Sequence, residues 1–355
     1  MIDPGLFVER DSAPDSEGKT VALGAMRLEA GSTLPSVRLA YQTWGRFDGE
    51  NAVLVCHALT GDSNATSWWD RMVGPGRPID TDRYFVICSN VLGGCQGSTG
   101  PSSLAEDDAP YGSRFPIITV GDMVDAQARL LDHLGVNYLA AVAGGSMGGM
   151  QALEWTSRYP QRVQRAFVSA SAMRHSAMQI AFNEVGRQAV MRDSRWLGGD
   201  YLPGEGPDDG LSVARMLGHL TFLSPGAFEA KFARRLQNKL VPDYHLGIEF
   251  EVESYLQYQA GKFLKRFDAN SQLILTRAID YYEGPNFSAA SAKYGFVSYT
   301  SDWIYPTSMS AEAHAEAVAT GRASFHREID LPYGHDAFLL DGELQGEAFR
   351  ELMTS

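Results

Sequence analysis

A serine between glycines is the strongest chemical pattern in the sequence. Ser146 lies in the pentapeptide Gly144-Gly-Ser-Met-Gly148, after an apolar run and before a stretch with helical spacing. This strand–turn–helix context is typical of a nucleophile elbow, in which a strained turn projects the serine hydroxyl above a sheet and the glycines avoid clashes. The pattern predicts that Ser146 is the nucleophile of an acyl transfer. The alternative is a glycine-rich turn that only packs closely.

A nucleophilic serine needs a base, and the base needs an acid that orients it. In an elbow of this type the two partners follow the serine in the order acid, then histidine. Asp302 follows a strand-like run, and His335 lies in a glycine-containing loop after the last such run, whereas His57 comes before the serine. We therefore predict Asp302 as the acid and His335 as the base. Asp336 is unsuited to orient its own neighbour, because adjacent side chains point in different directions.

Acyl transfer also needs two backbone N–H groups that stabilise the oxyanion, each worth about 3 kcal/mol. Met147, directly after the nucleophile, is the first expected donor, and the second is expected from the loop after an early strand. The segment Val55-Cys-His-Ala-Leu-Thr-Gly-Asp62 fits this description. We predict Leu59 as the second donor and Thr60 as a substrate contact; the alternative is an ordinary turn.

Two hydrophobic periods indicate the elements that position these residues. Short apolar runs predict strands, and apolar residues three and four apart predict helices. Strands alternating with helices imply a mostly parallel sheet covered on both faces. The expected strands are 52–56, 84–89, 139–143, 165–169, 295–300 and 324–329, and the expected helices include 122–134, 177–192, 211–223, 227–240, 250–267 and 311–320. We predict an α/β core formed by residues 1–171 and 291–355, interrupted by a helical insertion, residues 172–290.

Composition narrows the class of protein. The 355 residues are 44% hydrophobic and 21% charged, as in ordinary globular proteins, which excludes disorder or a coiled coil as the dominant state. A net charge of -13 argues against a nucleic-acid partner. The chain has no apolar run long enough to span a membrane and no basic-then-apolar start of a signal peptide. Its three cysteines lack metal-ligand spacing, which fits free thiols in a reducing cytoplasm and no metal.

Several segments together resemble the homoserine O-acetyltransferase family of the α/β-hydrolase fold. In family order they are Leu39-Ala-Tyr-Gln-Thr-Trp-Gly, Cys56-His-Ala-Leu-Thr-Gly-Asp, Asn90-Val-Leu-Gly-Gly-Cys-Gln-Gly-Ser-Thr-Gly-Pro-Ser-Ser, Gly144-Gly-Ser-Met-Gly-Gly-Met-Gln-Ala, Ser301-Asp-Trp and Gly334-His-Asp-Ala-Phe-Leu. The resemblance implies transfer of acetyl from acetyl-CoA to the hydroxyl of L-homoserine through an acyl-serine, a step of methionine biosynthesis. It implies no cofactor, since acetyl-CoA is a co-substrate, and the same catalytic triad as the residues predict.

The resemblance also implies residues that bind the acceptor. In Ala214-Arg-Met-Leu-Gly-His-Leu-Thr-Phe, Arg215 matches the arginine that holds the acceptor carboxylate in the family, and Asp336 matches the partner of its ammonium. The alternatives are a solvated arginine on a helix surface and an aspartate that caps a loop. The family motif usually ends in tyrosine, where this sequence has Phe222.

The helical insertion is implied to be a lid that also joins two copies into a homodimer. A lid suits a transferase, because water would hydrolyse an exposed acyl-enzyme. Three rival functions remain open: transfer from succinyl-CoA or to serine, ester hydrolysis, and a catalytically silent interaction protein. Neither a nucleic acid nor a membrane is expected as a partner, and a cytoplasmic location is expected.

Overall fold

A sheet of eight strands forms the centre of the computed structural model, which describes residues 18–202 and 204–355. The first 17 residues, to which the expectation about a signal peptide applies, lie outside the described residues. The strand order is β1-β2-β6-β3-β7-β8-β9-β10, and the strands from β6 onwards are parallel. The strands are β1 (Lys19–Arg27), β2 (Thr33–Trp44), β3 (Ala52–Cys56), β6 (Phe85–Ser89), β7 (Ala141–Gly145), β8 (Arg165–Ser169), β9 (Lys293–Tyr299) and β10 (Ser324–Ile329), with a separate short pair, β4 (Val73–Gly74) and β5 (Ile79–Asp80).

Both faces of the central strands are buried under helices. Along β3, Leu54 and Cys56 join the apolar cluster on one face, and Val53 and Val55 join the cluster on the other. The first cluster includes helices α2 (Val120–His133), α3 (Met147–Arg158) and α9 (Thr307–Ala319), and the second includes α10 (Ala337–Leu340) and α11 (Leu344–Thr354), near α1 (Ala65–Trp68). The mostly parallel sheet covered on both faces, predicted from continuous apolar strands, is therefore confirmed.

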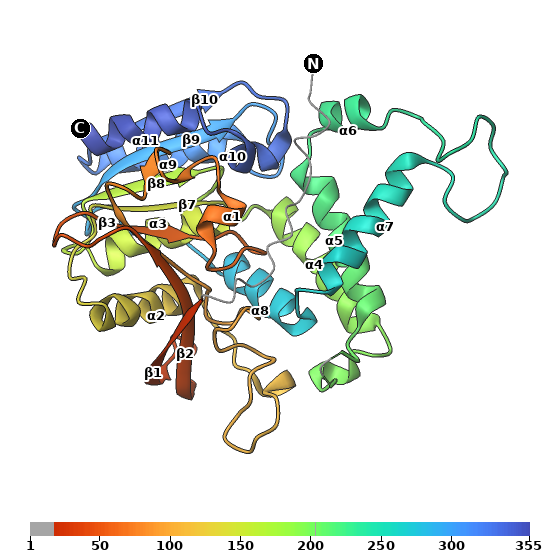
Figure 1. Ribbon diagram of the computed structural model, residues 1–355, viewed down its shortest axis with the longest axis horizontal. Coiled ribbons are helices and arrows are strands. Elements are labelled where there is room, and N and C mark those ends of the chain that lie inside the picture. The colour runs from red at the N-terminus through yellow and green to blue at the C-terminus, as the bar shows by residue number, and fades with distance from the viewer. Residues whose placement is uncertain (1–17, 203) are drawn as a thin grey trace.

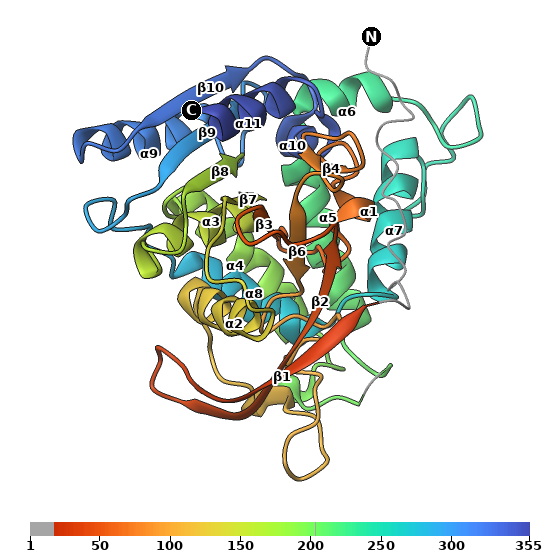
Figure 2. The same ribbon diagram turned by 60° about the vertical axis from the view of Figure 1, so that its left-hand side comes forward.

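Among the described residues, five α-helices lie between β8 and β9 in the chain. They are α4 (Ala177–Arg192), α5 (Asp208–Phe222), α6 (Pro225–Lys231), α7 (Glu251–Leu264) and α8 (Ala269–Asp280). Helix α5 packs between α4 and α7, and this group lies beside the sheet at the right of Figure 1. Figure 2 shows α7 and α9 at opposite sides of the molecule, with the sheet between them. Helix α8 contributes Ile274, Leu275 and Ala278 to the main apolar core.

The helix predicted over 227–240 is wrong in its second half. Helix α6 ends at Lys231, and Ala233 adopts a left-handed φ of 44°. The chain then turns back towards the start of α7, where the Gln237 N–H donates to the Glu249 carbonyl at 2.8 Å. A tertiary backbone pairing has replaced the helical hydrogen bonds that the local sequence favours.

Strands β1 and β2 and helix α8 are among the elements that were not expected, and one strand lies further along the chain than predicted. Strands β1 and β2 form an antiparallel extension, and β2 is antiparallel to β6, so the sheet is not wholly parallel. Helix α8 was not expected either, although the Asp268 side chain caps it by accepting from the Ser271 N–H. Strand β7 runs over Ala141–Gly145 rather than 139–143, because Leu139 makes only an isolated bridge to Val163.

Two further observations concern the cysteines and the lengths of the helices. Cys56, Cys88 and Cys95 are all free, and the first two are buried. In residues 18–202 and 204–355, no helix combines the length and the apolar character needed to cross a bilayer.

Removing one hydroxyl tests the contribution of a buried hydrogen bond between β9 and α3. The Tyr294 hydroxyl donates to Thr156 Oγ1 at 2.9 Å, and Thr156 itself donates to the Leu153 carbonyl. We expect Tyr294→Phe to reduce the free energy of unfolding by about 1 kcal/mol, because the variant loses one net hydrogen bond and keeps its ring. Urea unfolding measures the difference; a change in enzymatic rate would contradict the assignment of Tyr294 to the core alone.

Candidate active site

The turn between β7 and α3 places Ser146 at the carboxyl edge of the sheet. Ser146 has φ 55° and ψ −127°, a conformation that non-glycine residues adopt only where the surrounding structure imposes it. A Cβ added at Gly148 would lie 2.0 Å from the Cys56 carbonyl oxygen, and one at Gly144 would lie 2.3 Å from that of Gly148. Only glycines therefore let α3 begin so close to β3, and the turn has the strained form that the motif predicts.

His335 and Asp302 meet beside this turn. His335 Nδ1 lies 2.7 Å from Asp302 Oδ2, and both residues are buried. The other carboxylate oxygen, Oδ1, accepts hydrogen bonds from the Ile304 and Tyr305 N–H groups, so the Asp302 side chain is fixed from both sides. Because Nδ1 donates its proton to the carboxylate, Nε2 of His335 is left as the basic nitrogen.

The Ser146 hydroxyl lies near that of Tyr305, a residue that the sequence analysis did not single out, and as a hydrogen-bonding neighbour it partly offsets the rise in the pKa of the Tyr305 phenol that burial causes. Among the described residues the hydrogen bonds join Asp302 to His335 but do not join His335 to Ser146. The Tyr305 ring stacks on the His335 ring, with centroids 4.9 Å apart, so all these groups share one site. Catalytic hydrogen bonds are often long or misaligned before substrate binds.

The two expected oxyanion donors lie on either side of the elbow. The loop after β3 is held by His57, whose Nδ1 donates to the Ala58 carbonyl at 2.7 Å and whose Nε2 accepts from the Val91 N–H at 3.0 Å. Neither the Leu59 nor the Met147 N–H donates to another group among the described residues. Both donors are therefore available to a substrate oxygen.

Arg215 and Asp336 come together next to His335. Arg215 is 4% exposed, which excludes a solvated arginine on a helix surface, and its guanidinium lies 4.5 Å from the Phe263 ring centroid. Burial lowers the pKa of Arg215, the Arg266 charge lowers it further, and Asp336 raises it. Burial raises the pKa of Asp336 from 3.8 to about 6, although the charges of His335 and Arg215 oppose that rise.

A small cavity lies between the oxyanion loop and Arg215. Its volume is about 80 Å³, and its walls include Leu59, Thr60, Arg215 and Phe222, beside helices α4 and α8. The Phe222 ring centroid lies 6.4 Å from that of His335. Because the residue is a phenylalanine, it brings no phenol oxygen to this wall. A larger cavity of about 380 Å³ lies beyond Arg266, and none of the predicted site residues lines it.

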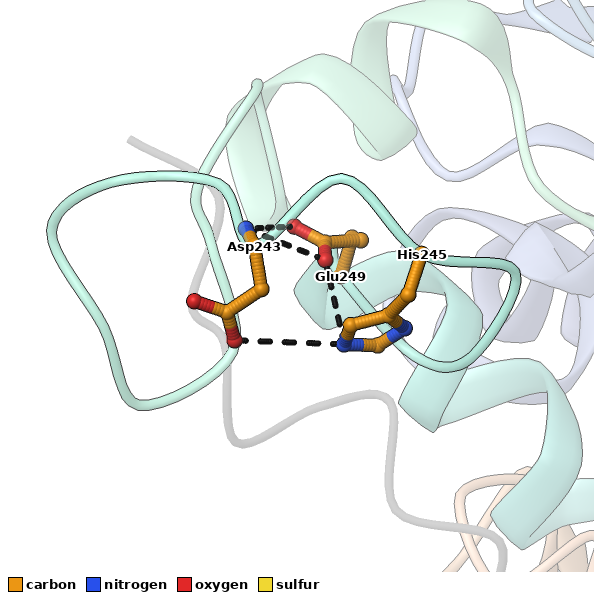
Figure 3. A group of neighbouring side chains, drawn as sticks. All are labelled: Asp243, His245 and Glu249. Atoms are coloured by element: carbon orange, nitrogen blue, oxygen red, sulfur yellow. Dashed lines mark hydrogen bonds and ion pairs between the residues drawn. The ribbon is translucent and has the colours of Figure 1, made fainter.

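One group of possible metal ligands lies away from this site, in the loop between α6 and α7 (Figure 3). Asp243, His245 and Glu249 are the only such group within the described parts of the chain, and His245 Nε2 lies 3.2 Å from Glu249 Oε1. The sequence analysis overlooked it, because only cysteine and histidine pairs were considered. Lys239 Nζ lies 2.9 Å from Asp243 and 3.1 Å from Glu249, so an ammonium group already compensates the carboxylates.

The mostly parallel sheet, covered by helices on both faces, and the strand–turn–helix elbow are those of the α/β-hydrolase fold. A family model described as the alpha/beta hydrolase fold matches residues 51–341. The homoserine O-acetyltransferase of Solidesulfovibrio magneticus is 51% identical over 339 residues, which cover 89% of this chain and 85% of that protein. The chain belongs to the homoserine O-acetyltransferase family, whose members are acyltransferases. The resemblance found in the sequence is confirmed.

Solved structures of both transferases and esterases are similar to this chain. The crystal structure of esterase E22 superposes with a TM-score of 0.88 at 27% identity, covering 95% of this chain and 99% of that one. The homoserine O-acetyltransferase of Bacillus anthracis superposes with a TM-score of 0.89 at 24% identity, covering 96% and 98%. The backbone alone therefore does not separate transfer from hydrolysis, and the side chains of the site must do so.

The desolvated carboxyl of Asp336 makes the free energy of unfolding depend on pH. Its pKa is higher in the folded protein than in the unfolded chain, so the folded state binds the proton more tightly, and stability falls as pH rises from about 4 to about 6. Asp336→Asn removes this effect, and we expect the variant to be more stable than the parent by about 1–3 kcal/mol at pH 7.5. Urea unfolding at pH 7.5 and pH 4.5 should show the gap shrinking at the lower pH. A gap that stays constant would contradict the assigned pKa.

Proposed function

We propose that this protein transfers the acetyl group of acetyl-CoA to the hydroxyl of L-homoserine, with Ser146 carrying the acyl group between the two. The observation that carries the proposal is the buried Arg215 together with the partly exposed but desolvated Asp336, beside the acid–histidine pair. An amino acid presents both a carboxylate and an ammonium group, and the pair offers one partner for each. A water molecule or a simple ester needs neither of them.

The first half-reaction loads the serine. His335 Nε2 takes the proton of the Ser146 hydroxyl, and the oxygen attacks the thioester carbonyl. The Leu59 and Met147 N–H groups stabilise the oxyanion of the tetrahedral intermediate. The carbon–sulfur bond then breaks, the CoA thiolate takes up the proton, and an acetyl ester remains on Ser146.

The second half-reaction passes the acetyl group on. His335 Nε2 takes the proton of the homoserine hydroxyl, whose oxygen attacks the ester on Ser146. The same two N–H groups stabilise the second oxyanion, and the Ser146 oxygen leaves with the proton from His335. Asp302 holds His335 in the same tautomer throughout. In this proposal His335 accepts and returns each proton, and the two N–H groups stabilise each oxyanion, so the reaction needs no cofactor.

Acceptor binding rests on the cavity beside Leu59. The planar fork of Arg215 suits two hydrogen bonds to one carboxylate, and the Phe263 ring holds that fork in place. Asp336, which does not line this cavity, would pair with the ammonium group, and Thr60 lines the cavity beside Leu59 in the oxyanion loop. A cavity of about 80 Å³ holds roughly six groups the size of water, which suits a small amino acid.

We further propose that residues 172–290 form a lid and a surface for a second copy. The lid would keep water from the acetyl ester while the acceptor binds. Large apolar side chains are more than half exposed on this insertion, which suits contact with another copy of the chain: Met178, Val185, Val213, Leu240, Val241, Tyr244, Leu246 and Tyr258. A biosynthetic enzyme with free thiols suits a cytoplasmic location.

Release of the CoA thiol tests the substrates directly. We expect release to depend on homoserine and to be faster from acetyl-CoA than from succinyl-CoA, and Ser146→Ala to lose at least about 10³-fold of the rate. Serine and water in place of homoserine are the controls. A preference for succinyl-CoA or serine would contradict the proposed substrates, and equal release in water alone would identify an esterase.

Arg215 can be tested by separating the two half-reactions. We expect Arg215→Lys, which keeps the charge but loses the fork, to raise KM for homoserine about 10- to 100-fold and to leave acetyl-enzyme formation unchanged. Single-turnover kinetics with acetyl-CoA alone isolates the first step. Arg235→Lys is the matched control, because Arg235 pairs with Glu251 at an exposed site of the same insertion. Equal damage to both half-reactions would contradict the role of Arg215.

A further inference from the structure

A buried carboxylate of the helical insertion is the start of a second polar chain that leads to Ser146. Asp280, at the end of α8, has a side chain only 4% exposed. Its Oδ1 accepts from Asn183 Nδ2 at 2.7 Å and contacts His175 Nδ1 at 2.9 Å, and its Oδ2 lies 2.7 Å from Arg187 Nη1. These partners come from α4 and from the segment before it, so the carboxylate is fully compensated inside the protein.

His175 continues the chain to Tyr305. Its side chain is 3% exposed, and its Nε2 lies 2.7 Å from the Tyr305 hydroxyl. In the neutral imidazole whose Nδ1 proton points to Asp280, Nε2 accepts, and the hydroxyl of Tyr305 is the donor. The Tyr305 oxygen is then left to accept a hydrogen bond from the Ser146 hydroxyl.

Tyr305 contacts every member of the predicted triad. Its N–H donates to Asp302 at 2.8 Å, its ring stacks on His335, and its hydroxyl has the Ser146 hydroxyl as a neighbour that opposes the rise in its pKa. Burial raises the pKa of Tyr305 well above its usual value, and the bond from Ser146 opposes that rise, so the phenol remains protonated at neutral pH. A neutral hydroxyl whose own proton is committed to His175 can hold the serine hydroxyl in one direction.

We propose that Tyr305 is a positioning residue for Ser146, and that His175 and Asp280 fix its hydroxyl from the helical insertion. This inference rests on the proposed role of Ser146 as nucleophile. A serine hydroxyl without a fixed partner rotates among three staggered positions. Misplacement of a reacting atom by about 1 Å slows a reaction by up to about 10²-fold, so a fixed partner for the nucleophile has a large effect on rate.

Tyr305→Phe removes only the hydroxyl and keeps the ring on His335. We expect acetylation of Ser146 by p-nitrophenyl acetate, a donor that needs neither CoA nor homoserine, to become about 10- to 100-fold slower. The KM for homoserine should stay within about twofold, because the acceptor cavity is unchanged. Tyr294→Phe is the matched control: it also loses one buried tyrosine hydroxyl, and its acetylation rate should equal that of the parent.

A double-mutant cycle tests whether His175 acts through Tyr305. We expect His175→Phe to slow acetylation less than Tyr305→Phe does, and the double variant to be no slower than Tyr305→Phe alone. Additive losses would overturn the chain from Asp280, because His175 would then act by another route. Thermal unfolding of each variant separates loss of rate from loss of fold.

The outcomes also separate this inference from the proposed function. If the parent protein forms no ester that Ser146→Ala abolishes, both proposals fail. If the parent forms the ester and Tyr305→Phe forms it within twofold of the same rate, only the positioning role fails. A variant that loses affinity for homoserine without slower acetylation also overturns that role, since Tyr305 would then belong to the acceptor site.

Discussion

The close approach of α3 to β3 at Gly148 is the constraint on which the rest of the site depends. With no side chain at this position, the helix begins against the Cys56 carbonyl, and the chain before it must take the strained conformation of Ser146. The same approach brings the start of α3 against the His57 carbonyl, at the beginning of the loop that carries Leu59. The proposed nucleophile and oxyanion donors therefore depend on this backbone contact.

A second general feature of the structure is that its interior carboxylates are compensated by hydrogen bonds or opposite charges. Asp302 is held by His335 and two N–H groups, Asp280 by a histidine, an arginine and an asparagine, and Asp336 by the charges of its neighbours. Buried charges are tolerated only where hydrogen bonds and opposite charges replace water. Asp336 is the least compensated of these, as its raised pKa indicates, and a ligand ammonium group would supply the missing partner.

The sequence was informative wherever local rules decide the structure. The elbow around Ser146 and the strand-end positions of Asp302 and His335 follow from short motifs and chain order, and the alternation of strands with helices follows from periodicity. Tyr305 and Asp280 could not be found in this way. Their partner His175 is distant in the chain from both, and only the packing of α4 and α8 against the core brings the three together. The wrong half of the helix predicted over 227–240 has the same origin, since backbone pairing with a distant segment outweighs local preference.

The helical insertion separates two neighbouring strands of the sheet along the chain, and this affects how the protein folds. Strands β8 and β9 are neighbours, with Arg165 paired to Lys293, yet the whole helical insertion lies between them in the chain. Closing so long a segment is entropically unfavourable, and contacts distant in sequence slow folding. Helix α5 packs against α4 and α7 within the insertion, so these helices can assemble before β9 docks, which shortens the effective loop. Until β9 docks, the edge of β8 stays unpaired, and such an edge is where newly made chains associate wrongly.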